Sequence, residues 1–192
     1  MLQLTIINNL KEAIIGESNA KKKYELFSQQ ALKENLPFIS KLFRAIAYAE
    51  SVHIKNHLKA LSVLTGKQVK PEEFVKIDES RIKKIVKNTS LNLKNAIEGE
   101  LYETKKMYKD FVKNAKKNKN DVAELTFFLA RKAEKVHAKL YEEFLKKLKN
   151  KEKLEMDIKI YVCEICGNVE LMIKPSKCPI CDHSEKFFKL IE

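Results

Sequence analysis

Two Glu-x-x-His patterns lie in the middle of apolar helical stripes, and they constrain the fold more than any other feature. They are Glu50…His53 and Glu134…His137. Residues three apart on an α-helix share one face, so both side chains of each pair can reach the same ion. The stripes around them are apolar, with Ile46, Ile54 and Leu61 in one and Phe127, Ala130, Tyr141 and Phe144 in the other. A carboxylate in such a place costs several kcal/mol unless it is compensated.

Helical periodicity continues to about residue 150, with few Gly and Pro residues to interrupt it. It predicts four long helices, at about 4–34, 37–66, 90–116 and 121–150, with Asp121 as the N-cap of the fourth. The connection over 67–88 is long for a helical bundle and is interpreted as a crossover, with a short helix at about 79–86.

The other two helices also carry acids among apolar residues. Glu17 lies between Ile14 and Tyr24 on the first, and Glu100 and Glu103 lie between Ile97 and Met107 on the third. All four helices therefore direct carboxylates inward near their middles. Binding of two iron or manganese ions explains this pattern, because glutamate and histidine supply the oxygen and imidazole ligands that these ions take. The alternative is that the acids face water and the helical phase is misassigned.

The four cysteines form two Cys-x-x-Cys pairs near the C-terminus, Cys163 with Cys166 and Cys178 with Cys181. This arrangement is typical of one tetrahedral ion, zinc or iron. Gly167 permits the tight turn after the first pair, and Asp182 stands at the matching place after the second. Short strands are predicted at 158–162, 169–173 and 187–191. With a boundary at 150–156, we expect a helical domain over 1–150 and a small β/metal-knuckle domain over 157–192.

These motifs resemble the rubrerythrin family in their order along the chain. The third helix reads Gly99-Glu100-Leu101-Tyr102-Glu103 and continues to Met107-Tyr108, while Glu17, Ala20, Tyr24 and Phe27 have the family's spacing on the first helix. The resemblance implies a mainly α chain, with a ferritin-like di-iron four-helix bundle followed by a rubredoxin-like domain. It implies two non-haem irons in the bundle and one iron in the four-cysteine site, where zinc is a possible substitute.

The resemblance also assigns roles to the site residues. The implied bundle ligands are Glu17, Glu50, Glu100, Glu103, Glu134 and His137. His53 is the group that an iron would exchange for Glu103 when its oxidation state changes. Tyr24 and Tyr108 would hydrogen-bond to ligand carboxylates; the alternative is that they are ordinary core tyrosines. His57 is a departure that the family does not demand, and we interpret it as a packing or supporting residue rather than a ligand.

The activity implied by the resemblance is reduction of hydrogen peroxide by a non-haem di-iron peroxidase. Electrons would pass through the rubredoxin-type iron from a rubredoxin or from an NAD(P)H-dependent reductase, a separate protein because this chain has no nucleotide-binding motif. The resemblance also implies a homodimer, head-to-tail or helix-swapped, in which the cysteine domain of one subunit serves the di-iron site of the other. Two alternatives stay open: a ferritin-like ferroxidase or iron-handling protein, and a helical bundle with a zinc-ribbon interaction module.

Composition excludes other classes. The net charge is +12, but the lysines are scattered over outer helical faces without interleaved aromatic residues, so specific nucleic-acid binding is not supported. No apolar run approaches the length of a membrane span. Residues 1–11 have no basic, signal-like start, so we expect a cytoplasmic protein. In that reducing compartment the cysteine cluster favours metal over disulfides.

Overall fold

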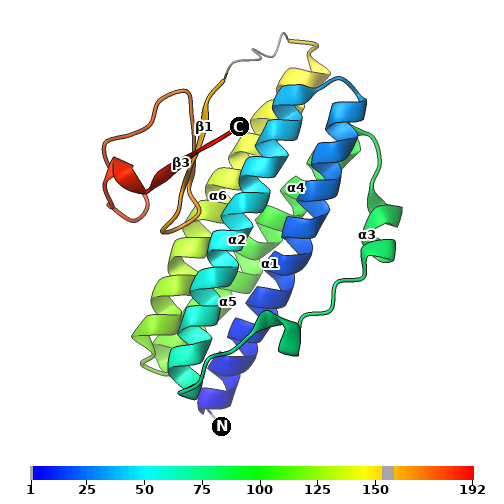
Figure 1. Cartoon of the computed structure of the whole chain (residues 1–192). Coiled ribbons are helices and arrows are strands. Elements are labelled where there is room, and N and C mark those ends of the chain that lie inside the picture. Colours follow the sequence, from blue (N-terminus) through cyan, green and yellow to red (C-terminus); the bar gives the residue numbers. More distant parts are fainter. Residues whose placement is uncertain (1, 153–157) are drawn as a thin grey trace.

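The computed structural model describes residues 2–152 and 158–192. Its main body is a bundle of long helices lying side by side (Figure 1). The elements are α1 (Leu2–Lys33), α2 (Pro37–Thr65), α4 (Thr89–Tyr102) continued by α5 (Tyr108–Lys117), and α6 (Asp121–Lys149). The predicted four-helix bundle is therefore confirmed.

Local sequence sets where these helices begin and end. Pro37 occupies the first turn of α2, and Gly66 closes that helix with a left-handed φ of 68°. Asn120 caps α6, since its side-chain oxygen accepts a hydrogen bond from the Ala123 N–H at 2.9 Å. The prediction of Asp121 as the N-cap was wrong by one residue. Asp121 is instead the first residue of the helix, where its negative charge suits the positive end of the helix dipole.

The predicted crossover lies along the outer side of α1 (Figure 1). It contains a short 3₁₀ turn, η1 (Pro71–Glu73), and the helix α3 (Glu79–Ile85), which confirms the short helix predicted there. Ile82 of α3 is buried, and Lys22 of α1 forms an ion pair with Glu79, with 2.7 Å between the lysine Nζ and a carboxylate oxygen. These contacts hold the crossover against the bundle.

The third long helix is not a regular α-helix, contrary to the prediction of one continuous helix over 90–116. A π-helical turn, η2 (Glu103–Met107), separates α4 from α5. The Tyr108 N–H bonds to the carbonyl of Glu103, five residues earlier. Such turns insert an extra residue and occur often at functional sites.

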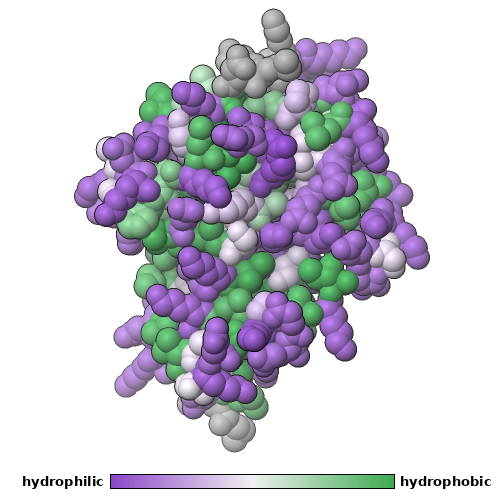
Figure 2. All heavy atoms as spheres, in the orientation of Figure 1, coloured by the Kyte–Doolittle hydropathy of each residue, from purple (hydrophilic) through white to green (hydrophobic). Residues whose placement is uncertain are grey.

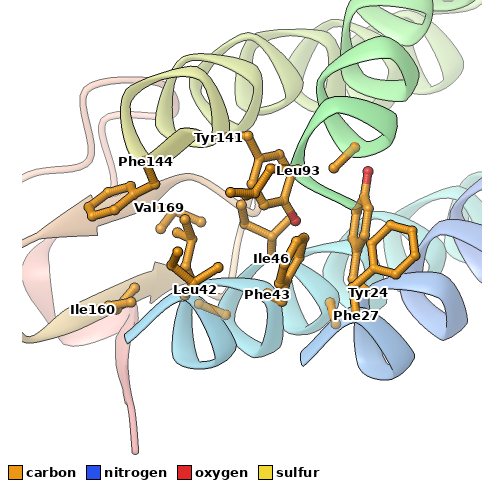
Figure 3. Close-up of a cluster of buried hydrophobic side chains, with 14 of the residues drawn as sticks. Tyr24, Phe27, Leu42, Phe43, Ile46, Leu93, Tyr141, Phe144, Ile160 and Val169 are labelled. Atoms are coloured by element: carbon orange, nitrogen blue, oxygen red, sulfur yellow. The ribbon is translucent and has the colours of Figure 1, made fainter. Parts of the chain in front are cut away.

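The bundle core is divided into two apolar clusters by its acidic residues. One cluster includes Tyr24, Phe27, Phe43 and Tyr141 (Figure 3). The other contains residues nearer the opposite end of each helix, among them Leu10, Ile14, Leu61, Phe111 and Phe127. On each long helix the predicted metal ligands, all Glu and His, fall between the two clusters.

The C-terminal sheet is small and antiparallel, with strand order β2-β1-β3. Its strands are β1 (Ile160–Cys163), β2 (Val169–Leu171) and β3 (Phe188–Ile191), close to the predicted positions. Ile160 and Val169 pack beside Leu42 of α2 and Phe144 of α6, so sheet and bundle share one core cluster (Figure 3). The division at 150–156 stays a prediction, and residues 153–157 lie outside the described part of the chain.

Hydrophilic side chains are spread over most of the face shown in Figure 2, with apolar residues in smaller groups between them. Within residues 2–152 and 158–192, no helix is long and apolar enough to cross a membrane.

Candidate metal centres

The four long helices bring two overlapping ligand clusters together in the middle of the bundle. One consists of Glu17, Glu50, His53 and Glu134, and the other of Glu50, Glu100, Glu134 and His137. Within each cluster the candidate ligand atoms all lie within 4.8 Å of one another. Glu50 and Glu134 belong to both clusters, so these two residues connect them.

The carboxylate oxygens show that this site fits cations. Five glutamates each have one buried side-chain oxygen without a hydrogen-bond partner: Glu17, Glu50, Glu100, Glu103 and Glu134. Buried acceptors of this kind are costly unless something positive faces them. Carboxylate oxygens together with imidazole nitrogens are the donor set that divalent iron or manganese takes.

The two histidines face the carboxylates with one ring nitrogen and the C-terminal domain with the other. The Nδ1 atoms of His53 and His137 lie 2.7 and 2.6 Å from the two oxygens of Glu134. Their Nε2 atoms lie 3.0 Å from the Cys166 carbonyl and 2.9 Å from the Gly167 carbonyl. Metal-binding histidines commonly hold their second ring nitrogen in this way, which fixes the ring and leaves the first free to bind.

Electrostatics in the metal-free cluster follow from burial and mutual contact. Burial and the charge of Glu134 raise the pKa of the Glu100 carboxyl to about 8. Burial alone would raise the pKa of Glu134 too, but His53 and His137 hold it well below its usual range. Burial opposes protonation of both histidines, yet the carboxylates, Glu134 foremost, raise the two imidazole pKa values. The protonated rings thus supply positive charge where cations would otherwise sit.

Two tyrosines support the carboxylates through matching contacts from opposite helices. The Tyr24 hydroxyl on α1 donates to Glu100 at 2.6 Å, and the Tyr108 hydroxyl on α5 donates to Glu17. Tyr24 follows Glu17 by seven residues, a same-face spacing, whereas Tyr108 follows Glu100 by eight. The π-helical turn absorbs the extra residue and turns Tyr108 back toward the site.

Glu103 differs from the other acids. It is 8% exposed and does not belong to either cluster. It lies at one wall of a cleft of about 520 Å³ between α1 and the crossover. The other lining residues are Gly16, Asn19, Ala20, Lys23, Lys76, Asp78, Arg81, Ile82 and Ile85. Glu103 is thus the one predicted bundle ligand that borders this cleft, while His53 occupies the ligand cluster.

The four cysteines form a second centre. The Sγ atoms of Cys163 and Cys181 are 3.7 Å apart, and those of Cys166 and Cys178 are 3.6 Å apart. Metal–sulfur bonds of about 2.3 Å place the corners of a tetrahedron about 3.8 Å apart, whereas a disulfide needs about 2.05 Å. Gly167 and Asp182 adopt the left-handed φ values of 79° and 59° expected of the two turns.

The C-terminal domain contacts the helices that carry the histidines within one chain, whereas the family resemblance implies that it serves the di-iron site of a second subunit. Asn56 of α2 donates to the Ile165 carbonyl at 2.8 Å, and the Tyr48 hydroxyl donates to Glu164 at 2.6 Å. A Cβ added to Gly167 would meet His53 Nε2 at 2.3 Å. The first cysteine pair therefore lies directly on the bundle's metal site. No local sequence pattern signals a contact between such distant residues.

Comparison with known proteins agrees with this geometry. A family model described as rubrerythrin matches residues 8–145. The chain belongs to the rubrerythrin family. It is 37% identical to rubrerythrin-2 of Clostridium acetobutylicum over 90% of this chain and 89% of that protein. It is 33% identical to nigerythrin of Nitratidesulfovibrio vulgaris over 91% of this chain and 81% of that one.

The fold agrees as well. A nigerythrin structure described as fully reduced and all ferrous superposes with a TM-score of 0.84 at 31% identity, over 96% of this chain and 86% of that one. This rubrerythrin is therefore a di-iron protein with a rubredoxin-like four-cysteine site. The roles of individual ligands stay predictions. His57 lies outside both clusters and contacts Tyr108 instead.

Gly167→Ala should separate the cysteine domain from the bundle. Both Gly167 and Gly66 have left-handed φ values, so alanine at either costs about 1–2 kcal/mol in backbone strain. Only at Gly167 does the new Cβ also collide with His53; at Gly66 nothing lies within 4 Å. We expect faster amide hydrogen exchange around 160–169 in Gly167→Ala but not in the control variant Gly66→Ala. Equal exchange in the two variants would contradict the docking described above.

Removal of the metals should make stability fall with pH. In the unfolded chain Glu100 loses its proton near its ordinary pKa of 4.5, but in the folded chain only near about 8. Between these values the folded chain holds a proton that the unfolded chain has already released, so folding requires proton uptake and the metal-free protein should lose on the order of a few kcal/mol of stability as pH rises through that window. Urea unfolding of metal-free and zinc-loaded protein at both ends of the window measures this. A gap between the two forms that does not widen with pH would contradict it.

Proposed function

We propose that this protein is a peroxidase that reduces hydrogen peroxide to water. Its bundle irons would be re-reduced through an iron held by the four cysteines. One observation carries the proposal: the cysteine knuckle accepts hydrogen bonds from both cluster histidines, through the Cys166 and Gly167 carbonyls. A bundle that only stored or oxidised iron would have no use for a redox centre at this place.

We assign the bundle ligands accordingly. Glu50 and Glu134 would serve both ion positions, because each belongs to both clusters. Glu17 and His53 complete one position, and Glu100 and His137 complete the other. The partnerless oxygen of buried Glu103 supports its role as the ligand that exchanges with His53. The structure then represents the arrangement with His53 turned toward the site.

When bound, two ferrous ions would supply the two electrons that break the O–O bond. The protein provides fixed positions for the groups around them. Tyr24 and Tyr108 hold the carboxylates of Glu100 and Glu17 in place. Burial raises both tyrosine pKa values well above the usual range, so both hydroxyls keep the proton that they donate. The apolar clusters on either side exclude bulk water.

The cleft beside Glu103 supports access for a small oxidant. It begins at the surface between α1 and the crossover and ends at the one proposed ligand that is not packed into the cluster. Movement of Glu103 would therefore open the site on the side where a small molecule arrives.

The contact between the two centres provides a route for electrons. From Cys166 a path runs along its own backbone to the carbonyl and across one hydrogen bond to His53. The opposite side of the cysteine site carries Cys181, which is partly exposed. That side suits a separate donor, either a rubredoxin or an NAD(P)H-dependent reductase. Zinc would fill the same site but would be redox-silent, so we assign iron.

We also propose a homodimer, head-to-tail or helix-swapped, in the cytoplasm. In the structure the knuckle contacts α2 and α6 of its own chain, and two chains related by twofold symmetry would form the same contact between subunits by exchanging these domains reciprocally. Gel filtration that finds an active monomer would contradict this assembly.

Glu103→Ala tests the peroxidase proposal. Loss of the exchanging carboxylate should lower kcat/KM for hydrogen peroxide by roughly a hundredfold, while the iron–thiolate colour of the cysteine site stays unchanged. The matched control is Glu98→Ala, an exposed glutamate on the same helix. Undiminished turnover in Glu103→Ala would contradict the assigned role, and absence of turnover in the unmodified, iron-loaded protein would overturn the proposal.

Gly16→Leu tests the access route. A Cβ at Gly16 meets nothing within 4 Å, so a larger residue can start there without strain on the backbone, and leucine favours the helix by roughly 0.8 kcal/mol over glycine. We expect kcat/KM for peroxide to fall about tenfold or more, with metal content and melting temperature maintained. Gln29→Leu, at an exposed position of α1 away from the cleft, is the control. Equal rates in the two variants would show that peroxide arrives elsewhere.

A further inference from the structure

Three consecutive backbone carbonyls in the first cysteine pair contact donors on the bundle. The Ile165 carbonyl accepts a hydrogen bond from Asn56 Nδ2 at 2.8 Å. The next two carbonyls, those of Cys166 and Gly167, are the ones that the cluster histidines contact. Asn56 follows His53 by three residues on α2, so the two side chains share one face of the helix. Of the three donors, Asn56 is the one that has no place in the metal site assigned above.

The same peptide groups face the cysteine sulfurs with their N–H ends. The Cys163 sulfur accepts hydrogen bonds from the backbone N–H groups of Ile165 and Cys166, and the Cys166 sulfur accepts one from that of Asn168. The carbonyl of Ile165 and the N–H of Cys166 belong to a single peptide group. A donor bonded to this carbonyl draws electron density away from the N–H, which strengthens the hydrogen bond from that N–H to sulfur.

The contacts of the second cysteine pair lie within its own domain. The Asp182 N–H donates to the Cys178 carbonyl at 2.9 Å, and His183 Nδ1 lies 2.9 Å from the Cys181 carbonyl. The bundle therefore acts on the sulfur site from the side of the first pair. Both sulfur-bearing residues of that pair are buried, so water competes little for the N–H groups that face them.

We propose that Asn56 is a positioning residue that raises the reduction potential of the four-cysteine site through the Ile165–Cys166 peptide. The inference rests on the proposed function, in which an iron at this site takes one electron from a separate donor and passes it to the bundle. On reduction the ion changes from ferric to ferrous, no proton is exchanged, and the thiolates carry more negative charge. N–H dipoles directed at the sulfurs stabilise this added charge and so favour the reduced state.

The contact thus links the position of the cysteine domain to its redox properties. With the domain docked on α2, the Asn56 amide polarises the peptide; with the domain away from α2, water would take the place of the amide at the Ile165 carbonyl. The site is therefore reduced most easily when it lies on the bundle that will receive the electron.

Asn56→Leu removes the donor at similar side-chain size. In a redox titration that follows the iron–thiolate colour, we expect the ratio of ferrous to ferric iron at a fixed potential to fall by about threefold, which is a lower midpoint potential. Tyr48→Phe is the matched control. It removes another hydrogen bond between α2 and the same domain, but that bond goes to the Glu164 side chain and not to a backbone carbonyl.

The midpoint potential in Tyr48→Phe should stay unchanged. No shift in Asn56→Leu, or an equal shift in the two variants, would overturn the role of Asn56. Peroxide turnover of the unmodified protein is measured separately. An inert protein whose midpoint potential still falls in Asn56→Leu would overturn the peroxidase proposal and leave the effect of Asn56 in place.

A second measurement needs neither iron nor activity. In zinc-loaded protein, proton NMR of the Cys166 amide reports the strength of its hydrogen bond to sulfur. We expect this proton to move upfield in Asn56→Leu, because the bond weakens. The Asn168 amide should keep its shift, since the carbonyl of its peptide is contacted by His137. No shift at Cys166 would overturn the proposal, and so would equal shifts at both amides, because they would indicate general undocking of the domain.

Discussion

The structure depends on how the charge of five buried glutamates and two buried histidines is balanced in the middle of the bundle. Each glutamate there would be costly alone, and five of them present an oxygen that no protein group satisfies. Since these acids come from all four long helices, ions bound between them link every helix to its neighbours. The two apolar clusters provide ordinary packing on either side, and the acids between them define where the ions must lie.

The two histidines connect this site to the rest of the molecule. Each ring faces Glu134 with Nδ1 and a carbonyl of the cysteine knuckle with Nε2. The same contacts therefore orient the two imidazole rings, hold the small sheet against α2 and α6, and bring the cysteine site close to the acidic cluster of the bundle. Gly167 makes this approach possible, because any side chain there would occupy the space of the His53 ring.

The sequence predicted most of the residues that come together in the two centres, because their pattern is encoded locally. Glutamate three residues before histidine on an apolar face, and paired cysteines, are visible in a short window. The π-helical turn was missed. The only hint of it is a difference in spacing: Tyr24 follows Glu17 by seven residues, whereas Tyr108 follows Glu100 by eight. The cap at Asn120 was missed by one residue, since Asn120 and Asp121 are both good N-cap residues. The contacts of His57 and Gly167 could not be predicted, because the residues that they contact lie far away in the sequence.

The central claim is that the cysteine site delivers electrons to the bundle site through the contact at the knuckle. Rapid anaerobic mixing of fully reduced, iron-loaded protein with hydrogen peroxide tests it most directly, by following the iron–thiolate charge-transfer colour together with peroxide consumption. The account predicts that colour appears as peroxide is consumed, and that the cysteine iron is oxidised only when the bundle site is intact. Peroxide consumption without development of that colour would contradict it.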